Sequence, residues 1–284
     1  METVTLNNGV EMPMLGLGVY RVTRAEDCIR AVRTALDAGY RLIDTAAVYG
    51  NESAVGRAIA ESGVPREEIF LTTKIWVRDF GATRTPVAFS ESLERLGTDY
   101  VDLMLLHQPY GDWPAAWRAL EPEVAAGRAR AIGVSNFIPS DLERLRSFAS
   151  VPPAVNQVER HPYIQRPELD AAHAADGTVP EAWEPIGKAS PELLRDPVLV
   201  ALADKYGKSV AQVILRWQVQ SGYVAIPKST SAGHIAENIA IFDFALSDEE
   251  MASIAGLDRG RGRRPLPRWL MGLAVRAIPV RQTT

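Results

Sequence analysis

A short stretch of the sequence, residues 42–50 (LIDTAAVYG), places a carboxylate and a phenol close together. Apolar residues run into Asp44, small residues follow, and Tyr49 stands just before Gly50. The pattern predicts a strand that ends at the carboxylate and a loop that presents the phenol at the same edge. A phenol is a poor acid at neutral pH unless a nearby cation favours its ionised form. Chemistry at Tyr49 therefore requires a cation and a further polar group from elsewhere in the chain.

Two other apolar stretches end on suitable side chains. Lys74 follows FLTT, and His107 follows VDLMLL. A lone lysine or histidine at a strand end is more often a surface residue than a functional one. Because both follow almost entirely apolar strands, we expect them to face one pocket together with Asp44 and Tyr49.

Proton transfer to a carbonyl oxygen suits these four residues. We expect Lys74 to lower the pKa of Tyr49, Asp44 to pair with Lys74, and His107 to orient the substrate oxygen. No nucleophile activated by a base and no set of metal ligands accompanies them, so neither acyl transfer nor a metal site is expected. A proton donor without a nucleophile needs an electron source, which indicates a hydride-carrying cofactor.

Eight strand patterns alternate with eight helical segments along the chain. This rhythm predicts a single α/β domain, a closed (β/α)8 TIM barrel spanning residues 1–258. Turn residues 7–9 (Asn-Asn-Gly) predict an N-terminal β-hairpin that closes the bottom of the barrel. An open doubly wound sheet is the alternative, but the first loop lacks its usual G-x-G-x-x-G. The predicted strands are 15–18, 41–44, 70–74, 101–106, 129–134, 154–157, 179–183 and 224–227, and the predicted helical segments are 25–38, 52–62, 86–96, 115–126, 140–147, 167–175, a double segment 197–220, and 232–242.

The composition is that of an ordinary globular protein. The chain has 284 residues, 46% hydrophobic and 23% charged, with a formal net charge of −4, which gives no electrostatic argument for nucleic acid. A single cysteine, Cys28, excludes an internal disulfide and is expected to be a buried structural thiol. Because we find neither a signal-peptide pattern nor a membrane-spanning apolar run, we expect a cytoplasmic protein, and we expect a monomer.

The residues resemble those of the aldo-keto reductase family over nearly the whole chain. The motifs that carry the resemblance occur in family order and are MPMLGLGVY, GYRLIDTAAVYGNESAVGRAI, TTKIW, LLHQP, GRARAIGVSNF, PAVNQVERHPY, and IPKS followed by AENI. The resemblance is strongest to short-loop bacterial members such as 2,5-diketo-D-gluconate reductases. It implies a (β/α)8 barrel that binds NADPH without a Rossmann fingerprint and reduces an aldehyde or ketone to an alcohol.

The resemblance also assigns residues to roles. The catalytic tetrad maps onto Asp44, Tyr49, Lys74 and His107, with Tyr49 as the general acid. The implied cofactor-binding residues are Ser135, Asn136 and Gln157 at the nicotinamide carboxamide, Trp183 against the nicotinamide ring, Pro185, Ile186 and Gly187 along the pyrophosphate, and Lys228, Ser229, Thr230, His234, Glu237 and Asn238 at the adenosine end. The expected substrate pocket is lined by Tyr20, Ala46, Trp76, His107, Gln108 and Trp113.

Two positions near the cofactor depart from the family pattern. His234 stands where many NADPH-specific members have an arginine, and a largely neutral imidazole grips a phosphate less well than a guanidinium. We therefore expect NADPH use with tolerance of NADH. Glu184 follows the stacking aromatic, where a small residue is usual, and should repel the pyrophosphate unless it turns outward or pairs with Lys188.

The tail, residues 259–284, has no counterpart in the family pattern. It holds seven arginines and an apolar stretch, 269–278. Its first interpretation is a cover over the barrel mouth; disorder, or a patch for a partner or an anionic surface, are the alternatives. For the whole chain, a non-catalytic regulatory subunit that binds the nicotinamide cofactor is the alternative to a reductase, and a metal-dependent barrel hydrolase is a third reading.

Overall fold

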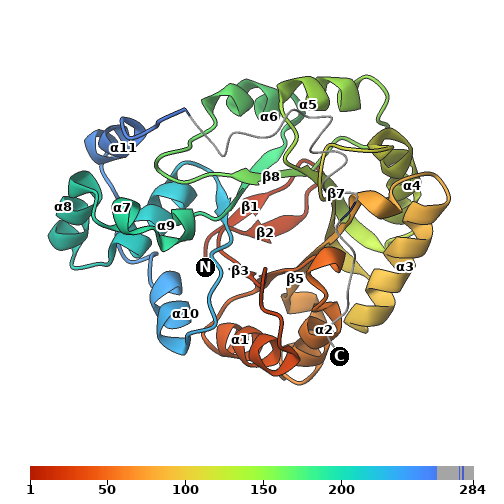
Figure 1. Cartoon of the computed structure of the whole chain (residues 1–284), viewed down its shortest axis with the longest axis horizontal. Coiled ribbons are helices and arrows are strands. Elements are labelled where there is room, and N and C mark those ends of the chain that lie inside the picture. Colours follow the sequence, from red (N-terminus) through yellow and green to blue (C-terminus); the bar gives the residue numbers. More distant parts are fainter. Residues whose placement is uncertain (261–274, 276, 278–284) are drawn as a thin grey trace.

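The computed structural model describes residues 1–260, Val275 and Ala277. Its centre is an eight-stranded parallel sheet in which the strands follow one another in chain order, from β3 to β10. Parallel bridges from Leu15 to Ala225 and from Gly18 to Lys228 join the first strand to the last and close the barrel (Figure 1). The strands are β3 Leu17–Gly18, β4 Leu42–Asp44, β5 Phe70–Ile75, β6 Val101–Leu106, β7 Ala129–Ser135, β8 Val155–Glu159, β9 Val179–Trp183 and β10 Val224–Ala225.

Helices surround this barrel, as the alternating pattern predicts, and the predicted (β/α)8 fold is confirmed (Figure 1). The α-helices are α1 Ala25–Asp37, α2 Glu52–Ala60, α3 Arg84–Leu96, α4 Trp113–Ala125, α5 Pro139–Arg146, α6 Asp170–Asp176, α7 Pro191–Leu194, α8 Pro197–Tyr206, α9 Val210–Gln220, α10 Ala232–Ile239 and α11 Asp248–Ala255. Short 3-10 helices are η1 Ala47–Tyr49, η2 Arg66–Glu68, η3 Val77–Asp79, η4 Pro167–Leu169 and η5 Gly187–Ala189.

Local sequence explains where the double helical segment divides. Helix α8 ends at Gly207, whose φ of 61° is in the left-handed region that suits glycine. Helix α9 then begins with Ser209 as its N-cap, in a reciprocal capping box with Gln212. Helix α11, which we did not predict, begins with the same signal, a capping box between Ser247 and Glu250.

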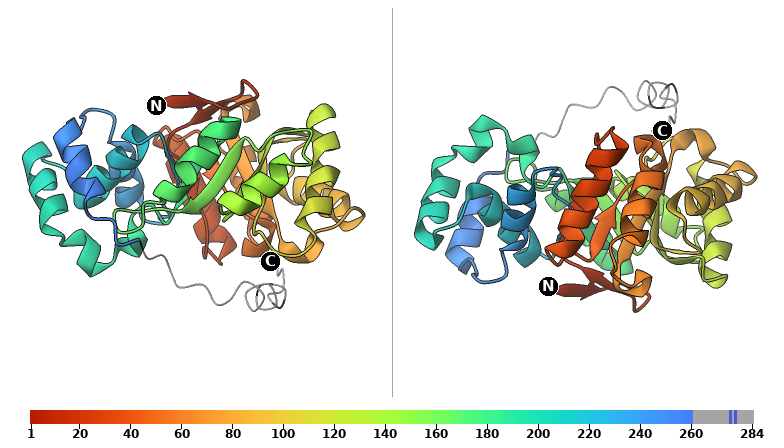
Figure 2. Two further views of the ribbon diagram at one scale, coloured as in Figure 1. Left: turned by 90° about the horizontal axis from the view of Figure 1, so that it is seen from above. Right: turned by 90° about the horizontal axis from the view of Figure 1, so that it is seen from below.

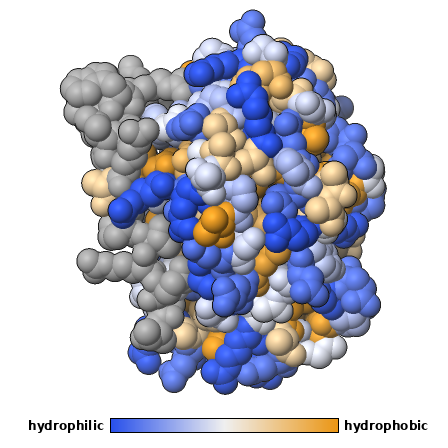
Figure 3. All heavy atoms as spheres, turned by 90° about the vertical axis from the view of Figure 1, so that its right-hand side faces the viewer, coloured by the Kyte–Doolittle hydropathy of each residue, from blue (hydrophilic) through white to orange (hydrophobic). Residues whose placement is uncertain are grey.

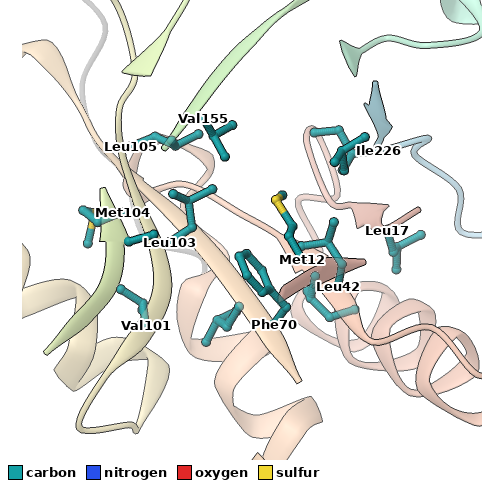
Figure 4. Close-up of a cluster of buried hydrophobic side chains, with 14 of the residues drawn as sticks. Met12, Leu17, Leu42, Phe70, Val101, Leu103, Met104, Leu105, Val155 and Ile226 are labelled. Atoms are coloured by element: carbon teal, nitrogen blue, oxygen red, sulfur yellow. The ribbon is translucent and has the colours of Figure 1, made fainter. Parts of the chain in front are cut away.

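The predicted N-terminal hairpin closes one end of the barrel. Strands β1 (Thr3–Thr5) and β2 (Glu11–Pro13) pair antiparallel and lie at one end in both views of Figure 2. Met12 of β2 is fully buried and lies beside Phe70 and Leu42, at the N-terminal ends of β5 and β4 (Figure 4). The hairpin therefore seals the bottom, and the C-terminal ends of the strands lie at the other end.

The core is continuous from the barrel interior to the helix layer. Every residue of β5 and β6 is buried, as expected of parallel strands covered on both faces, although β5 includes Thr72, Thr73 and Lys74 and β6 includes Asp102. Outside the barrel, α2 and α3 approach so closely that a Cβ on Gly56 would lie 2.1 Å from the carbonyl oxygen of Leu96. A glycine is required at this crossing because any side chain there would push the helices apart.

Cys28 is fully buried in α1, and burial raises the pKa of its thiol to about 12, as expected of a structural cysteine. Among the described residues, no helix is both long and apolar enough to cross a bilayer. On the face in Figure 3, hydrophobic residues are scattered among hydrophilic ones. The tail expected at 259–284 lies largely outside the described residues. Among its described residues, Val275 is buried against Trp76 and Val77.

Candidate active site

A lysine, an aspartate and a tyrosine meet at the C-terminal ends of β4 and β5. Lys74 is fully buried, and its Nζ lies 2.6 Å from each carboxylate oxygen of Asp44 and 2.9 Å from the carbonyl oxygen of Thr45. The same Nζ lies 3.4 Å from the hydroxyl of Tyr49, which η1 holds above the end of β4. The structure thus brings together three of the four residues predicted to be catalytic, in the order Asp44, Lys74, Tyr49.

The charge balance differs from the one we expected at Tyr49. Burial, together with the charge of Asp44 and the neighbouring Tyr20, raises the pKa of Tyr49 well above its ordinary value. Burial and these neighbouring groups outweigh any lowering by Lys74, so the pKa of Tyr49 lies above its ordinary value and not below it as predicted. Lys74 Nζ makes two contacts of 2.6 Å with the Asp44 carboxylate, but its contact with the Tyr49 hydroxyl is longer, at 3.4 Å. The phenol consequently keeps its proton at neutral pH, which is the form a proton donor needs.

The fourth predicted residue, His107, lies against the same cluster. Its ring centroid is 5.6 Å from that of Tyr49 and 5.0 Å from that of Trp76, both in edge-to-face geometry. Burial and the charge of Lys74 lower the pKa of His107 well below its ordinary value, so the imidazole is neutral. Its Nδ1 is buried without a hydrogen-bond partner in the described part of the chain. A neutral imidazole carries one N–H and can donate it to an oxygen in the pocket.

Polar groups on β7 and β8 form a connected wall beside the cluster. The Ser135 hydroxyl donates to the backbone oxygen of Gln157 at 2.9 Å, and Asn136 Nδ2 donates to the backbone oxygen of His107 at 3.2 Å. Asn136 stands in the left-handed region at φ 65°, which asparagine tolerates better than most residues. Its Oδ1 accepts a hydrogen bond of 3.0 Å from Trp183 Nε1. Asn136 therefore fixes the indole of the predicted stacking residue.

The predicted adenosine end lies at the start of α10. Ser231 caps this helix, and Ser229 Oγ accepts a hydrogen bond of 3.1 Å from the Ser231 backbone nitrogen. The backbone N–H groups of the first helical turn and the partial positive charge there make such a helix start suitable for an anion. The side chains of Lys228, Thr230 and His234 are exposed there, Glu237 is half-buried, and Asn238 is buried.

The loop after β9 has an unusual backbone. Glu184, Lys188 and Ala189 have φ values of 50°, 57° and 52°, although none of them is glycine. Gly187, with a φ of 54°, makes the same kind of turn without that cost. Lys188 Nζ lies 3.3 Å from Glu184 Oε1. Glu184 therefore pairs with Lys188, which is one of the two arrangements expected from the sequence.

The predicted substrate residues do not all share one environment. Tyr20 is 47% exposed and stacks on Tyr49 with ring centroids 5.0 Å apart. Trp76 is buried between His107 and Val275, and the indole nitrogen of Trp76 has no hydrogen-bond partner in the described residues. Ala46 is buried beside η1, and Gln108 is half-buried after His107.

Trp113 has a different environment from the other predicted substrate residues. It is buried between Phe137 and Phe148, with the Arg144 guanidinium over its ring. Phe137 lies in the loop after β7 and Phe148 just after α5, so Trp113 packs against this part of the core, and its place in the substrate pocket stays a prediction.

One residue of the cluster was missed by the sequence reasoning. Glu181, on β9, is fully buried and accepts a hydrogen bond of 2.8 Å from Gln157 Nε2, which also donates to Asp44 Oδ2 at 2.9 Å. A carboxylate inside the otherwise apolar strand VPEAW was the available signal. Within the described chain, no cluster of three or more His, Cys, Asp or Glu could hold a metal ion.

Comparison with known proteins agrees with this geometry. Residues 14–259 match the model of the Aldo/keto reductase family, which is most of the chain. The chain belongs to the aldo-keto reductase family. This aldo-keto reductase is 50% identical over 279 residues to morphine 6-dehydrogenase of Pseudomonas putida, covering 93% of the chain and 94% of the relative.

Two further matches point to the same family. Identity is 49% over 267 residues to glyoxal reductase of Bacillus subtilis (strain 168), covering 94% of this aldo-keto reductase and 96% of the relative. A Bombyx mori aldo-keto reductase, solved in complex with NADP, superimposes with a TM-score of 0.90 at 36% identity, covering 95% of this chain and 96% of that one. The family membership inferred from the sequence motifs is confirmed.

Proposed function

We propose that the protein reduces an aldehyde or ketone to the alcohol with NADPH, and that Tyr49 donates the proton. The observation that carries the proposal is the position of Lys74 Nζ between the Asp44 carboxylate and the Tyr49 hydroxyl. A buried, charged ammonium beside a protonated phenol stabilises the negative charge that grows on Tyr49 as its proton leaves. No observation favours the non-catalytic alternative, because all four groups needed for the chemistry are present and close together.

Each of the four residues has a distinct task in this mechanism. Tyr49 transfers its proton to the carbonyl oxygen of the substrate as that oxygen gains negative charge. Lys74 stabilises the resulting phenolate, and Asp44 keeps the lysine charged and fixed. His107, neutral and edge-on to Tyr49, donates a hydrogen bond that aims the same oxygen at the phenol.

The residues of the polar wall fit a nicotinamide cofactor. When bound, the cofactor supplies the hydride. Ser135, Asn136 and Gln157 offer an ordered set of donors and acceptors for a carboxamide, and the Trp183 indole, fixed by Asn136, offers a flat face for an aromatic ring. Lys188, in the loop after β9, and Lys228, before the start of α10, supply positive charge for phosphates.

We further propose that NADPH is preferred and NADH tolerated. Lys228 and the capped start of α10 favour a 2′-phosphate, but His234 stands exposed where a permanently charged arginine would grip it. Losing one such charged contact costs about 1.5–3 kcal/mol, or roughly 10- to 150-fold in preference.

The substrate proposal is a small carbonyl compound that fits an aromatic pocket. Tyr20, Tyr49 and Trp76 surround the place where the carbonyl must lie, and aromatic walls suit planar or apolar compounds. The two named relatives act, by their names, on glyoxal and at a ring position of morphine. A panel of candidate substrates should therefore range in size from a small dicarbonyl compound to a bulky polycyclic ketone or alcohol.

The remaining proposals concern the organisation of the protein. We propose a cytoplasmic monomer in which residues 1–258 form the catalytic barrel and 259–284 a separate tail. The buried contact of Val275 with Trp76 supports a role for the tail as a cover over the substrate pocket.

A single assay tests the reaction. Purified protein is mixed with NADPH and 4-nitrobenzaldehyde, glyoxal or a polycyclic ketone, and loss of the reduced cofactor is followed by absorbance. We expect turnover by the wild type and a loss of about 10²- to 10⁴-fold in kcat for Tyr49→Phe, which removes only the transferable proton. Tyr206→Phe, which removes a hydroxyl that bonds Glu250 outside the site, is the matched control and keeps kcat within about threefold. Equal, very slow rates for wild type and Tyr49→Phe would instead favour the regulatory subunit.

A further inference from the structure

The strongest unexplained feature is the buried carboxyl group of Glu181. It comes from the middle of β9, has no exposed surface, and lies beneath the cluster described above. The two hydrogens of one amide nitrogen, Gln157 Nε2, are shared between Glu181 Oε2 at 2.8 Å and Asp44 Oδ2 at 2.9 Å. The other oxygen, Glu181 Oε1, is buried and has no hydrogen-bond partner in the described residues.

The charges around this amide decide where a proton lies. Asp44 has both oxygens 2.6 Å from Lys74 Nζ and so retains its negative charge. Glu181 has no comparable ion pair, and an ionised carboxylate would leave a charged oxygen buried and unpaired. Burial and the charge of Asp44 raise the pKa of Glu181 to about 8. At neutral pH the proton therefore rests on Glu181.

The surroundings contain few groups that could oppose this arrangement. The titratable groups acting on Glu181 are Asp44 on β4 and Lys74 on β5, and Glu181 acts in turn on Tyr49 of η1. The neighbouring β10 contributes only Val224 and Ala225. On β8, the carboxylate of Glu159 is near the cations of Arg166 and the imidazole of His161, at 4.0 Å and 3.9 Å.

We propose that Glu181 is a positioning residue for the reduction: neutral, it fixes the Gln157 amide against Asp44, and on ionising it weakens Tyr49 as an acid. The proposal rests on the proposed function, because Gln157 and Tyr49 matter in this way only in a carbonyl reductase. It explains why a carboxyl group, and not an apolar residue, lies inside a buried strand.

The neutral form organises the cofactor wall. With both hydrogens of Gln157 Nε2 donated to carboxyl oxygens, only the Gln157 carbonyl is left, and it can only accept. This orientation suits the N–H₂ group of a carboxamide. Without an acceptor at position 181, the amide loses one of its two restraints and the carbonyl is held less firmly.

Ionisation of Glu181 makes Tyr49 a weaker acid. A second negative charge near Asp44 raises the pKa of Tyr49 further, since Glu181 is one of the groups that raise it. A phenol with a higher pKa gives up its proton less readily, so reduction slows as the pH rises through the pKa of Glu181. In the reduction the carbonyl carbon gains the hydride that a bound nicotinamide cofactor would supply, and the carbonyl oxygen gains the proton of Tyr49. The proton that Glu181 loses on ionising goes to solvent and takes no part in either transfer.

The substitution Glu181→Gln tests the proposal. Its amide oxygen accepts from Gln157 as before, and it stays neutral at every pH. In single-turnover reduction we expect it to match wild type within about twofold near pH 7 and to exceed it by about three- to tenfold near pH 9.5. Glu123→Gln removes a largely buried carboxylate of α4 that pairs with Arg128, and as the control it leaves the pH profile unchanged.

Two measurements do not depend on turnover. Infrared spectroscopy of the protein without cofactor should detect a protonated carboxyl band near pH 7 that fades near pH 9.5 and is missing in Glu181→Gln. Cofactor titration followed by tryptophan fluorescence should give a Kd for Glu181→Leu about three- to tenfold above wild type, whereas Glu181→Gln keeps the wild-type value.

Identical pH profiles for wild type and Glu181→Gln, or an infrared band that Glu181→Gln retains, would overturn the proposal. If wild type reduces no carbonyl compound, the proposed function fails, and the infrared and binding measurements still decide whether Glu181 carries the proton and restrains Gln157. The two failures are therefore distinguishable.

Discussion

The ammonium of Lys74 lies 2.6 Å from both carboxylate oxygens of Asp44, in a site where the two side chains are 0% and 2% exposed. Such a pair is costly to break, because the remaining charge is left buried without a partner. The pair stands at the ends of two buried strands, β4 and β5, and faces the other polar groups of the site. We regard it as a device that keeps a positive charge fixed beside Tyr49.

Breaking this pair should separate stability from chemistry. We expect Lys74→Met to lower the free energy of unfolding by about 3–5 kcal/mol, since it strands the Asp44 carboxylate, and to lower kcat by about 10²- to 10⁴-fold. The double variant Asp44→Asn/Lys74→Met removes both charges and should recover most of the stability but none of the activity. Urea unfolding and steady-state kinetics measure the two effects. Recovery of activity in the double variant would show that Lys74 acts only through folding.

The loop after β9 should oppose cofactor binding through its own charge. Lys188 is paired with Glu184, and a carboxylate beside the pyrophosphate path repels it. We expect Glu184→Gln to free Lys188 for the phosphates and to lower the Kd for NADPH about three- to tenfold, with a smaller effect at high salt. The control is Glu192→Gln, which removes the same charge from the exposed pair with Arg259. Fluorescence titration at two ionic strengths compares the variants. An unchanged Kd for Glu184→Gln would mean that the pair lies clear of the cofactor.

Most of the barrel follows from the sequence, because strands buried on both faces and amphipathic helices leave clear periodic signals. Residues 101–106 were predicted as a strand and form β6 with the same bounds. The short β10 was harder. Its predicted range, 224–227, contains Pro227, and the regular strand stops at Ala225, although Gly18 still donates to the Pro227 carbonyl.

The site was only partly predictable for a physical reason. Strand ends could be identified one by one, and barrel closure brings them together. The balance of charge among them depends on distances of a few tenths of an ångström. The prediction of a lowered pKa for Tyr49 failed because the sequence reveals neither the burial of the phenol nor how closely Asp44 holds Lys74. Glu181 was missed because its role depends on Gln157, which pairs with it across β8 and β9 but lies 24 residues earlier in the sequence.

Cofactor preference should respond to a single substitution at the start of α10. His234 is exposed next to Lys228 and the Ser231 cap, and an arginine there can place its guanidinium on a 2′-phosphate. We expect His234→Arg to raise the ratio of kcat/KM for NADPH over NADH by about 10- to 150-fold. For wild type, the same ratio should stay below about a thousandfold. The control His234→Gln changes the ratio little, because it supplies no charge. A wild-type preference beyond that bound would remove the proposed tolerance of NADH.

Stability should fall on mild acidification because of buried neutral histidines. Burial lowers the pKa of His173 to about 4, and burial together with Arg166 lowers that of His161 to about 4. In the unfolded chain a histidine binds a proton below about pH 6.5. Between about pH 6.5 and 4 the unfolded state thus holds more protons, and stability present above this window is lost as the pH falls. Each histidine contributes up to about 1.4 kcal/mol per pH unit.

His173 offers the test, since Asn156 Nδ2 donates to its Nε2 at 3.0 Å and a glutamine oxygen can accept the same bond. We expect the unfolding free energy of His173→Gln to depend less steeply on pH than that of wild type, by up to about 1.4 kcal/mol per unit across the window. His234→Gln, at an exposed position, is the matched control and keeps the wild-type slope. Urea unfolding at several pH values measures the slopes. Parallel curves for wild type and His173→Gln would mean that His173 takes up its proton without unfolding, through an opening of the contact between α6 and β8.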